Sequence, residues 1–330
     1  MTLRKSLLFA ALMLAGCGRM SREEEFRSVL PSKEMVEVKT PAQSGQALTS
    51  SADVSGQAAG DTSEFYKLTR NTTQVVNGGT LAVLGLVDAV TKYPPTTLTE
   101  DTAVWGPHTE ALAPNTWKLT VKKTGDNTYS YTLSAKAKDA ADSAFVDVIT
   151  GTHTASVDAA GEPLKGFGQG EFTLDWDKAQ TLPEHDNNVG RFTVKYARVD
   201  GKSAATVDAS FRQVRDDKDA TRRMDADYRY AATPGQGGEF NFKLTQDWYK
   251  PAGTASALEV LTIKSRWQES GTGRSDVKLS GGDLVGDATV NECWDTRFAS
   301  RYLRASYDPR VGYGTEATDC AFTSAAYSSL

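Results

Sequence analysis

The chain has 330 residues, a formal net charge of −5 and a pI near 5.4, and 39% of its residues are hydrophobic. This composition excludes a protein with many membrane spans, a collagen-like chain and a fully disordered one. The acidic balance also argues against a general nucleic-acid binder, which needs a basic surface to hold phosphates.

The N-terminus predicts export from the cytoplasm. Arg4 and Lys5 form a positive region, and residues 7–15 form an apolar stretch. That stretch is too short to cross about 30 Å of hydrocarbon as a helix, so it is typical of a signal peptide. We therefore leave residues 1–17 out of the prediction of the fold.

The end of this signal segment carries a motif. The run Leu14-Ala15-Gly16-Cys17 resembles the lipobox of bacterial lipoproteins, in which an aliphatic residue and two small residues precede the lipidated cysteine. The resemblance implies cleavage before Cys17 and acyl chains, including palmitate, on that residue. Such chains anchor a protein to a membrane without spanning it. The alternative is an ordinary signal peptide with a coincidental cysteine.

The resemblance also has implications for location. Gly18, not aspartate, follows the cysteine, and by enterobacterial sorting rules this implies the outer membrane, on a periplasmic or surface-facing side that stays open. The two other cysteines, Cys293 and Cys320, are expected to form one disulfide bond in this oxidising compartment. The alternative is a reactive thiol pair, but the spacing resembles no redox motif.

Two segments precede the expected domain. Residues 22–25 are charged, and a short apolar stretch then runs to Pro31, which predicts one or two helical turns near the membrane. Residues 40–63 hold few large apolar side chains, which is typical of a flexible coil. We therefore expect a membrane-proximal segment and flexible tether over residues 18–63, and a single β-rich domain over residues 64–330.

Residues 64–92 have apolar side chains mostly three and four positions apart, which predicts an amphipathic helix. Asp61 with Glu64 resembles a capping box, and Pro94 follows the expected end. The weak point is the run Asn77-Gly78-Gly79, which could kink the helix. The alternative interpretation is a hairpin turn at this run, between strands at 72–76 and 80–84.

After Pro95 the apolar period changes from about 3.6 to two, which predicts strands. About ten follow one another without intervening helices, and the segment 290–304 is a further strand or a short helix. We therefore expect a mainly β fold, an antiparallel meander that forms a barrel or a strongly curved sheet with the N-terminal helix packed against it. The ten predicted strands are 117–121, 129–133, 145–150, 170–176, 192–198, 205–214, 224–231, 240–248, 258–267 and 275–280.

Few residues have the arrangement that catalysis needs. The three histidines show no zinc-ligand spacing, and no motif for a cofactor or metal is present. Asp175 and Asp177 form the one carboxylate pair that could act as acid and base, and His185 lies between two acidic residues. The commoner interpretation is an aspartate pair that ends a strand and a solvated loop around His185.

The glycines at positions 166, 168 and 170 enter a predicted strand, not a helix. A phosphate loop needs a following helix N-terminus, so this run is not one. Glycines in a strand more often indicate a bulge or a close approach to the backbone.

By its lipobox, its acidic tether and its regular succession of hairpins the chain resembles uncharacterised β-rich lipoproteins of bacterial outer membranes. That resemblance carries no activity with it. We expect a non-enzymatic, membrane-anchored structural or binding module, with either a filled core or a cavity for an apolar ligand under the helix, and with an envelope protein as the other kind of partner. The alternative is a cell-envelope hydrolase that uses Asp175, Asp177 or His185.

Overall fold

A computed structural model describes residues 20–41, 54–215, 221, 223–246, 248 and 257–330. The helices are α1 (Arg22–Ser28), α2 (Lys33–Val36), α3 (Glu64–Thr91), α4 (Trp176–Ala179), α5 (Glu316–Asp319) and the 3-10 turn η1 (Asp142–Ala144). The strands are β1 (Thr97–Leu98), β2 (Thr102–His108), β3 (Asn115–Gly125), β4 (Thr128–Ala137), β5 (Val146–Val157), β6 (Pro163–Asp175), β7 (Arg191–Arg198), β8 (Ala205–Arg215), β9 (Arg223–Thr233), β10 (Gly237–Gln246), β11 (Glu259–Gln268), β12 (Gly273–Gly281), β13 (Ala288–Trp294), β14 (Ser300–Ala305) and β15 (Gly312–Tyr313).

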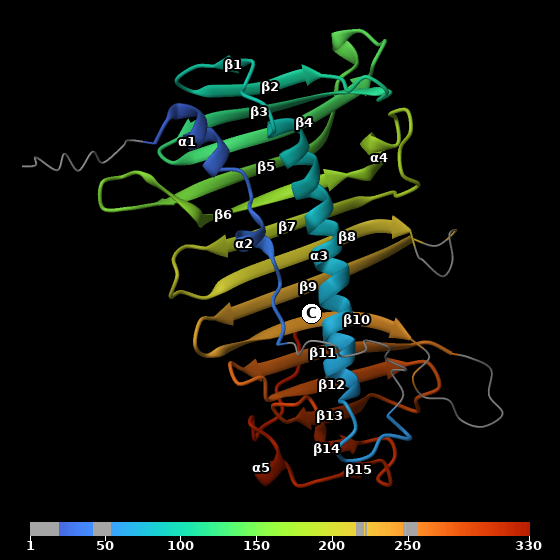
Figure 1. The fold of residues 1–330 in the computed structure, drawn as a ribbon. Helices are drawn as coiled ribbons and strands as arrows, with labels where there is room; N and C mark the ends of the chain where they lie inside the picture. Colours follow the sequence, from blue (N-terminus) through green and yellow to red (C-terminus); the bar gives the residue numbers. More distant parts are fainter. Residues whose placement is uncertain (1–19, 42–53, 216–220, 222, 247, 249–256) are drawn as a thin grey trace, which may run out of the picture.

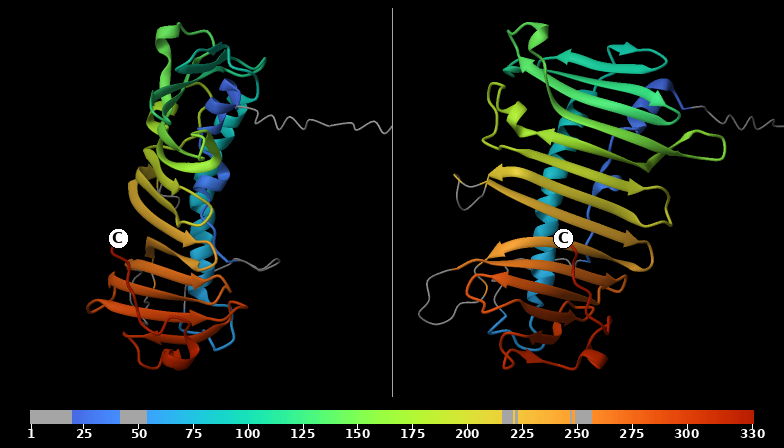
Figure 2. Two further views of the ribbon diagram at one scale, coloured as in Figure 1. Left: turned by 90° about the vertical axis from the view of Figure 1, so that its left-hand side faces the viewer. Right: turned by 180° about the vertical axis from the view of Figure 1, so that it is seen from behind.

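The strands form one antiparallel sheet in which each strand pairs with its neighbours in sequence, from β1 to β15. The predicted meander is therefore confirmed, and its ten strands correspond to β3–β12. The described strands do not close into a barrel, because β1 and β15 are the two free edges of a twisted, open sheet (Figures 1 and 2). The segment 290–304, which the sequence left open, forms the two strands β13 and β14.

Helix α3 runs across the strands on one face of the sheet, which we call the inner face (Figure 1). It is one continuous helix through Asn77, Gly78 and Gly79, so the helix prediction is confirmed and the hairpin alternative is wrong. Its N-cap is Ser63, whose hydroxyl accepts from the amide of Tyr66, and not the predicted Asp61. Length and composition alone would let this helix span a membrane, but here its apolar side packs on the sheet.

The opposite, outer face of the sheet is polar. Cross-strand ion pairs follow one another along it: Lys195 with Glu171 at 3.6 Å, Arg229 with Asp208 at 3.4 Å, and Lys264 with Glu239 at 2.8 Å. This arrangement is typical of an antiparallel sheet that buries one face and exposes the other to water.

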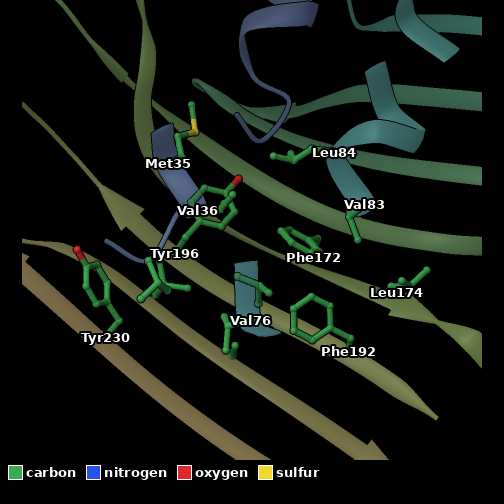
Figure 3. Packing of buried hydrophobic residues seen from close by; sticks show 14 of the residues in the cluster. Met35, Val36, Val76, Val83, Leu84, Phe172, Leu174, Phe192, Tyr196 and Tyr230 are labelled. Carbon is green, nitrogen blue, oxygen red and sulfur yellow. The ribbon is translucent and has the colours of Figure 1, made fainter. Parts of the chain in front are cut away.

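Residues 20–41, which we call the strap, lie on the inner face beside α3. The prediction placed them in a membrane-proximal segment, but their apolar side chains are buried: Phe26, Val29, Leu30, Met35, Val36 and Val38. Helix α1 packs on β6, and α2 packs on β6, β7 and β8. Figure 3 shows Met35 and Val36 of the strap beside Tyr196 of β7. The strap is thus part of the domain, while residues 42–53 of the expected tether lie outside the described residues.

The N-terminus of α3 is attached to the sheet through a buried carboxylate. Glu292 of β13 is fully buried and accepts from the amide of Phe65 at 3.0 Å and from the side chain of Gln57 at 2.5 Å. Burial raises the pKa of Glu292, although these hydrogen bonds act in the other direction. A carboxylate at this end also complements the helix dipole, so it fixes where α3 starts on the sheet.

The C-terminal segment covers the outer face of β11–β13. Asp276 of β12 is fully buried and pairs with Arg274 at 2.6 Å and with Arg266 at 2.7 Å, and it accepts from the amide of Ala326 at 2.9 Å. A buried carboxylate is stable only when its oxygens are occupied in this way. These contacts hold residues 316–328 against the sheet.

Candidate functional site

The three residues of the hydrolase hypothesis have structural roles. Asp175 ends β6, caps α4 by accepting from the amide of Lys178 at 3.1 Å, and pairs with Arg191 at 3.1 Å. Asp177 is exposed and accepts from the amide of Gly190 at 2.8 Å. His185 is exposed in the loop before β7, where its Nδ1 contacts the carbonyl of the next residue. These positions give the hydrolase hypothesis no support.

The cysteines divide between described and undescribed residues. Cys293 of β13 and Cys320, directly after α5, form a disulfide bond on the outer face, as the sequence predicted. Cys17 lies outside the described residues, so its lipidation stays a prediction. Within the described residues, no group of three or more histidine, cysteine or acidic side chains is placed to hold a metal ion.

The glycines in the first half of β6 leave space for the rings of His153 and Tyr196. A Cβ atom on Gly168 would lie 2.4 Å from the ring of His153, and one on Gly170 would lie 2.8 Å from the hydroxyl of Tyr196. The predicted close approach to the backbone is therefore confirmed. The Nδ1 atom of His153 lies 3.0 Å from that hydroxyl, and burial lowers the pKa of His153 to about 4. His153 is thus a neutral side chain of the core.

The two flanks of α3 differ. On one flank the strap packs on the inner face, with its middle bonded to the helix through Asn77. A cavity of about 1270 Å³ lies on this flank between the strap, α3 and residues 158–165. On the other flank, to the right of α3 in Figure 1, no described segment runs along the helix and packs on the inner face as the strap does. A cavity of about 730 Å³ lies there, within the range of about 300–1,000 Å³ that is usual for ligand pockets.

Apolar side chains from α3, α4 and β8–β10, together with Leu258 directly before β11 and Leu330 at the C-terminus, form most of this pocket. Phe211 of β8 is the centre of one wall, since its ring stacks on Phe192 at 4.4 Å and meets Tyr228 edge-on at 5.7 Å. Val75 is 61% exposed and Leu258 is 47% exposed, so apolar surface faces the open space. The principal apolar lining residues are Val75, Trp176, Phe211, Tyr228, Leu244 and Leu258.

The pocket lies where the sheet divides. Strands β9 and β10 pair from their hairpin only as far as Tyr228 and Phe242. Beyond this point β9 follows β8 and β10 follows β11, so the two strands diverge (Figure 1, right-hand side). We call the space between residues 223–227 and residues 243–246 the fork. Its outer side carries polar groups, among them Asp225, Asp227 and Lys243.

The sequence contained only a weak indication of this site. Val75 is one of the apolar side chains whose spacing predicts the amphipathic helix, and that spacing does not distinguish a buried position from an exposed one. Because periodicity shows which face of a strand is apolar but not where a ladder ends, the fork could not be predicted.

Comparison with known proteins adds no further assignment. No protein-family model, no curated protein and no solved structure matches the chain.

Proposed function

We propose that the protein is a non-enzymatic lipoprotein of the cell envelope, anchored to the outer membrane through Cys17, that binds an apolar ligand in the pocket beside α3. The observation that carries the binding function is the apolar lining of this pocket, which differs from the charged lining of the cavity on the strap flank of α3. The cavity of about 1270 Å³ on the strap flank is lined by many charged side chains, among them Arg27, Glu34, Asp88 and Lys165. The cavity of about 730 Å³ on the other flank instead has the apolar side chains Val75 and Leu258 exposed to it. Apolar surface gathered in a concavity is typical of a binding site.

With Cys17 acylated, one end of the sheet lies nearest the membrane. The strap packs on the sheet from Phe26 onwards, only a few residues after Cys17. The end of the sheet that carries α1 and β4–β6 therefore lies next to the bilayer if Cys17 is acylated. A long flexible tether between the membrane and the domain is then not required.

The anchor is tested by replacing Cys17. We expect the wild-type protein to incorporate labelled palmitate and to sediment with membranes, and the Cys17→Ser variant to do neither. An unlabelled wild-type protein, or a variant that still sediments with membranes, contradicts the anchor.

The pocket is tested with residues 18–330, which retain every described residue including the strap. Ala226 lies opposite Phe211 in the pocket wall, so Ala226→Trp fills the cavity. Ala231→Trp is the matched control, because Ala231 is on the same strand and the outer face. Native mass spectrometry of protein from expressing cells should show bound mass in the wild type and the control but not in Ala226→Trp.

A fluorescent apolar dye, anilinonaphthalene sulfonate, gives a second readout. We expect dye bound by the wild type and the Ala231→Trp control to be lost in Ala226→Trp. Equal dye binding by all three proteins, together with a bare mass for the wild type, excludes the pocket as the binding site.

A further inference from the structure

The hairpin between β5 and β6 carries a bulge. The ladder of the two strands is interrupted between the pair of Ala155 with Gly168 and the pair of Val157 with Pro163, so residues 164–167 lie opposite a single residue of β5. A bulge of this kind bends a strand and redirects its side chains. The hairpin also extends beyond its neighbours on the side of the sheet where α1 lies (Figures 1 and 2). The bulged residues are therefore presented to the surroundings of the domain.

Four apolar side chains lie on this hairpin and on the neighbouring turn between β7 and β8. Val157 and Leu164 are each 37% exposed, and Val199 is 41% exposed. The turn is attached to the hairpin, because the hydroxyl of Ser156 donates to the carbonyl of Val199 at 2.7 Å. Phe167 is partly exposed, and none of the four belongs to the hydrophobic clusters that the described residues form. We call Val157, Leu164, Phe167 and Val199 the tip patch.

The charges around the tip patch balance. Residues 157–167 and 198–203 hold three basic and three acidic side chains, which are Lys165, Arg198 and Lys202 and Asp158, Glu162 and Asp200. Asp158 and Asp200 are bonded within their own turns, where each accepts from a backbone amide, at 2.8 Å and 2.7 Å. A surface with balanced charges fits a zwitterionic layer, which carries phosphate and ammonium groups side by side, better than it fits a polyanion.

The position of the expected anchor indicates what meets the tip patch. Met20 and Lys165 line the same cavity, and Cys17 precedes Met20 by three residues. Three residues span at most about 11 Å, so acyl chains on Cys17 would hold the bilayer surface close to the bulge. Four side chains are also too few for a specific protein interface, which takes roughly 20–30 residues on each side. The position and the size of the patch therefore favour the bilayer.

We propose that the tip patch inserts into the headgroup region of a zwitterionic phospholipid bilayer, beside the lipid anchor. This inference rests on the anchor of the proposed function and adds a contact made by the polypeptide. Four apolar side chains bind a membrane weakly by themselves, but the anchor keeps them at the surface, where a weak contact is populated. Because successive turns of a meander alternate between the two side edges of the sheet, the fork lies at the edge opposite the tip patch. The inserted patch thus directs the pocket away from the bilayer.

The test places a fluorophore on the patch of the full, lipidated protein. Leu164→Cys, labelled with a nitrobenzoxadiazole group, is reconstituted into vesicles of phosphatidylcholine and phosphatidylethanolamine, with and without a nitroxide-labelled lipid. We expect the nitroxide to quench the fluorescence about twofold or more, because the label lies among the headgroups. Val285→Cys is the matched control, since Val285 is exposed in the turn between β12 and β13 at the opposite edge. Its fluorescence should not change. Replacing part of the lipid by phosphatidylglycerol should leave both results unchanged, because the charges of the patch balance.

Two aspartate variants of the lipidated protein give a second readout. Leu164→Asp combined with Val199→Asp should remove the slower hydrogen exchange that residues 157–167 show when the wild type is bound to the same vesicles. Val285→Asp should keep it.

The inference is overturned if the nitroxide quenches both labels equally or neither of them, or if the exchange of residues 157–167 on vesicles is the same in the wild type and the double variant. It is also overturned if the thiol of Leu164→Cys is shielded in native envelopes but its label is not quenched in pure lipid, since a protein then covers the patch. Wild-type protein that sediments with vesicles while the label stays unquenched leaves the anchor standing, whereas protein that never sediments removes the anchor itself.

Discussion

The side-chain amide of Asn77 bonds the backbone of Val38 in both directions. Its Oδ1 accepts from the Val38 N–H at 2.9 Å and its Nδ2 donates to the Val38 carbonyl at 2.9 Å. A side chain in the middle of α3 thereby pairs with the strap as one strand residue pairs with another. The run Asn77-Gly78-Gly79, where the sequence suggested a kink, joins the helix to the strap.

Replacement of Asn77 by leucine should destabilise the protein by about 2 kcal/mol, because Val38 is buried and both of its backbone groups would lose their partner. Urea unfolding measures this loss. Gln74→Leu, at an exposed position of α3, is the control and should change the free energy of unfolding by less than about 0.5 kcal/mol. Equal effects of the two changes contradict the role of Asn77.

Replacement of each glycine of α3 by alanine should change the stability of the protein by a different amount. A Cβ atom on Gly78 or Gly85 has no neighbour within 4 Å, whereas one on Gly79 lies 3.3 Å from the ring of Phe192. Gly78→Ala and Gly85→Ala should therefore stabilise the protein by up to about 1 kcal/mol. Gly79→Ala should lose most of this gain, since the ring must move. Thermal unfolding of the three variants compares them, and an equal gain for all three contradicts the close packing of α3 on β7.

Loss of the disulfide should lower the free energy of unfolding by about 3 kcal/mol. This is the loop-closure contribution expected when the two linked residues are 27 positions apart. The Cys293→Ser, Cys320→Ser double variant measures this in urea. A reducing agent should lower the stability of the wild type to that of the variant and leave the variant unchanged. Faster hydrogen exchange in residues 316–328 should accompany the loss, because the disulfide holds this segment on the outer face.

The stability of the protein should fall in acid through His153. Its pKa is about 4 in the folded protein and about 6.5 in an unfolded chain, so between these values the unfolded state binds more protons. The full stability is present above about pH 6.5, and about 3 kcal/mol is lost as the pH falls to 4. Unfolding measured from pH 7.5 to 4.5 tests this.

Two histidine variants separate this effect from other acid effects. His153→Gln should flatten the slope of stability against pH, whereas His185→Gln, in an exposed loop, should leave the slope unchanged. A slope that persists in His153→Gln assigns the acid sensitivity to other groups.

The buried faces of the strands could be predicted from the local alternation of apolar and polar residues. Trp117, Leu119 and Val121 alternate with polar residues and indeed face the inner side of β3, and the same holds for Tyr129, Tyr131 and Leu133 of β4. Alternation works here because each strand has one buried and one solvated face. The strands β1, β2 and β15 were not predicted. Strands β1 and β15 have two residues each and carry no period, and β2 has only Ala103 and Trp105 as buried apolar positions before Gly106 and Pro107.

The strap shows where local pattern fails. Phe26, Met35 and Val38 are separated by polar residues and by Pro31, so they resemble no amphipathic element of their own. They are buried because the inner face of the sheet presents Tyr129 and Tyr196 to them. Burial of a short segment depends on the surface that it meets, and that surface is assembled from strands more than a hundred residues away.

The sequence by itself determined the meander, the helix predicted over 64–92, the disulfide pair and the close approach at Gly168 and Gly170, because each depends on periodicity, on compartment chemistry or on the size of one residue. Only the tertiary structure decided which flank of α3 the strap covers, where the ladder between β9 and β10 ends, and that Asp175 caps α4 while Asp177 accepts from the amide of Gly190. Those features depend on which segments, distant in the sequence, pack on the same apolar face of the sheet. The local pattern of residues does not contain that information.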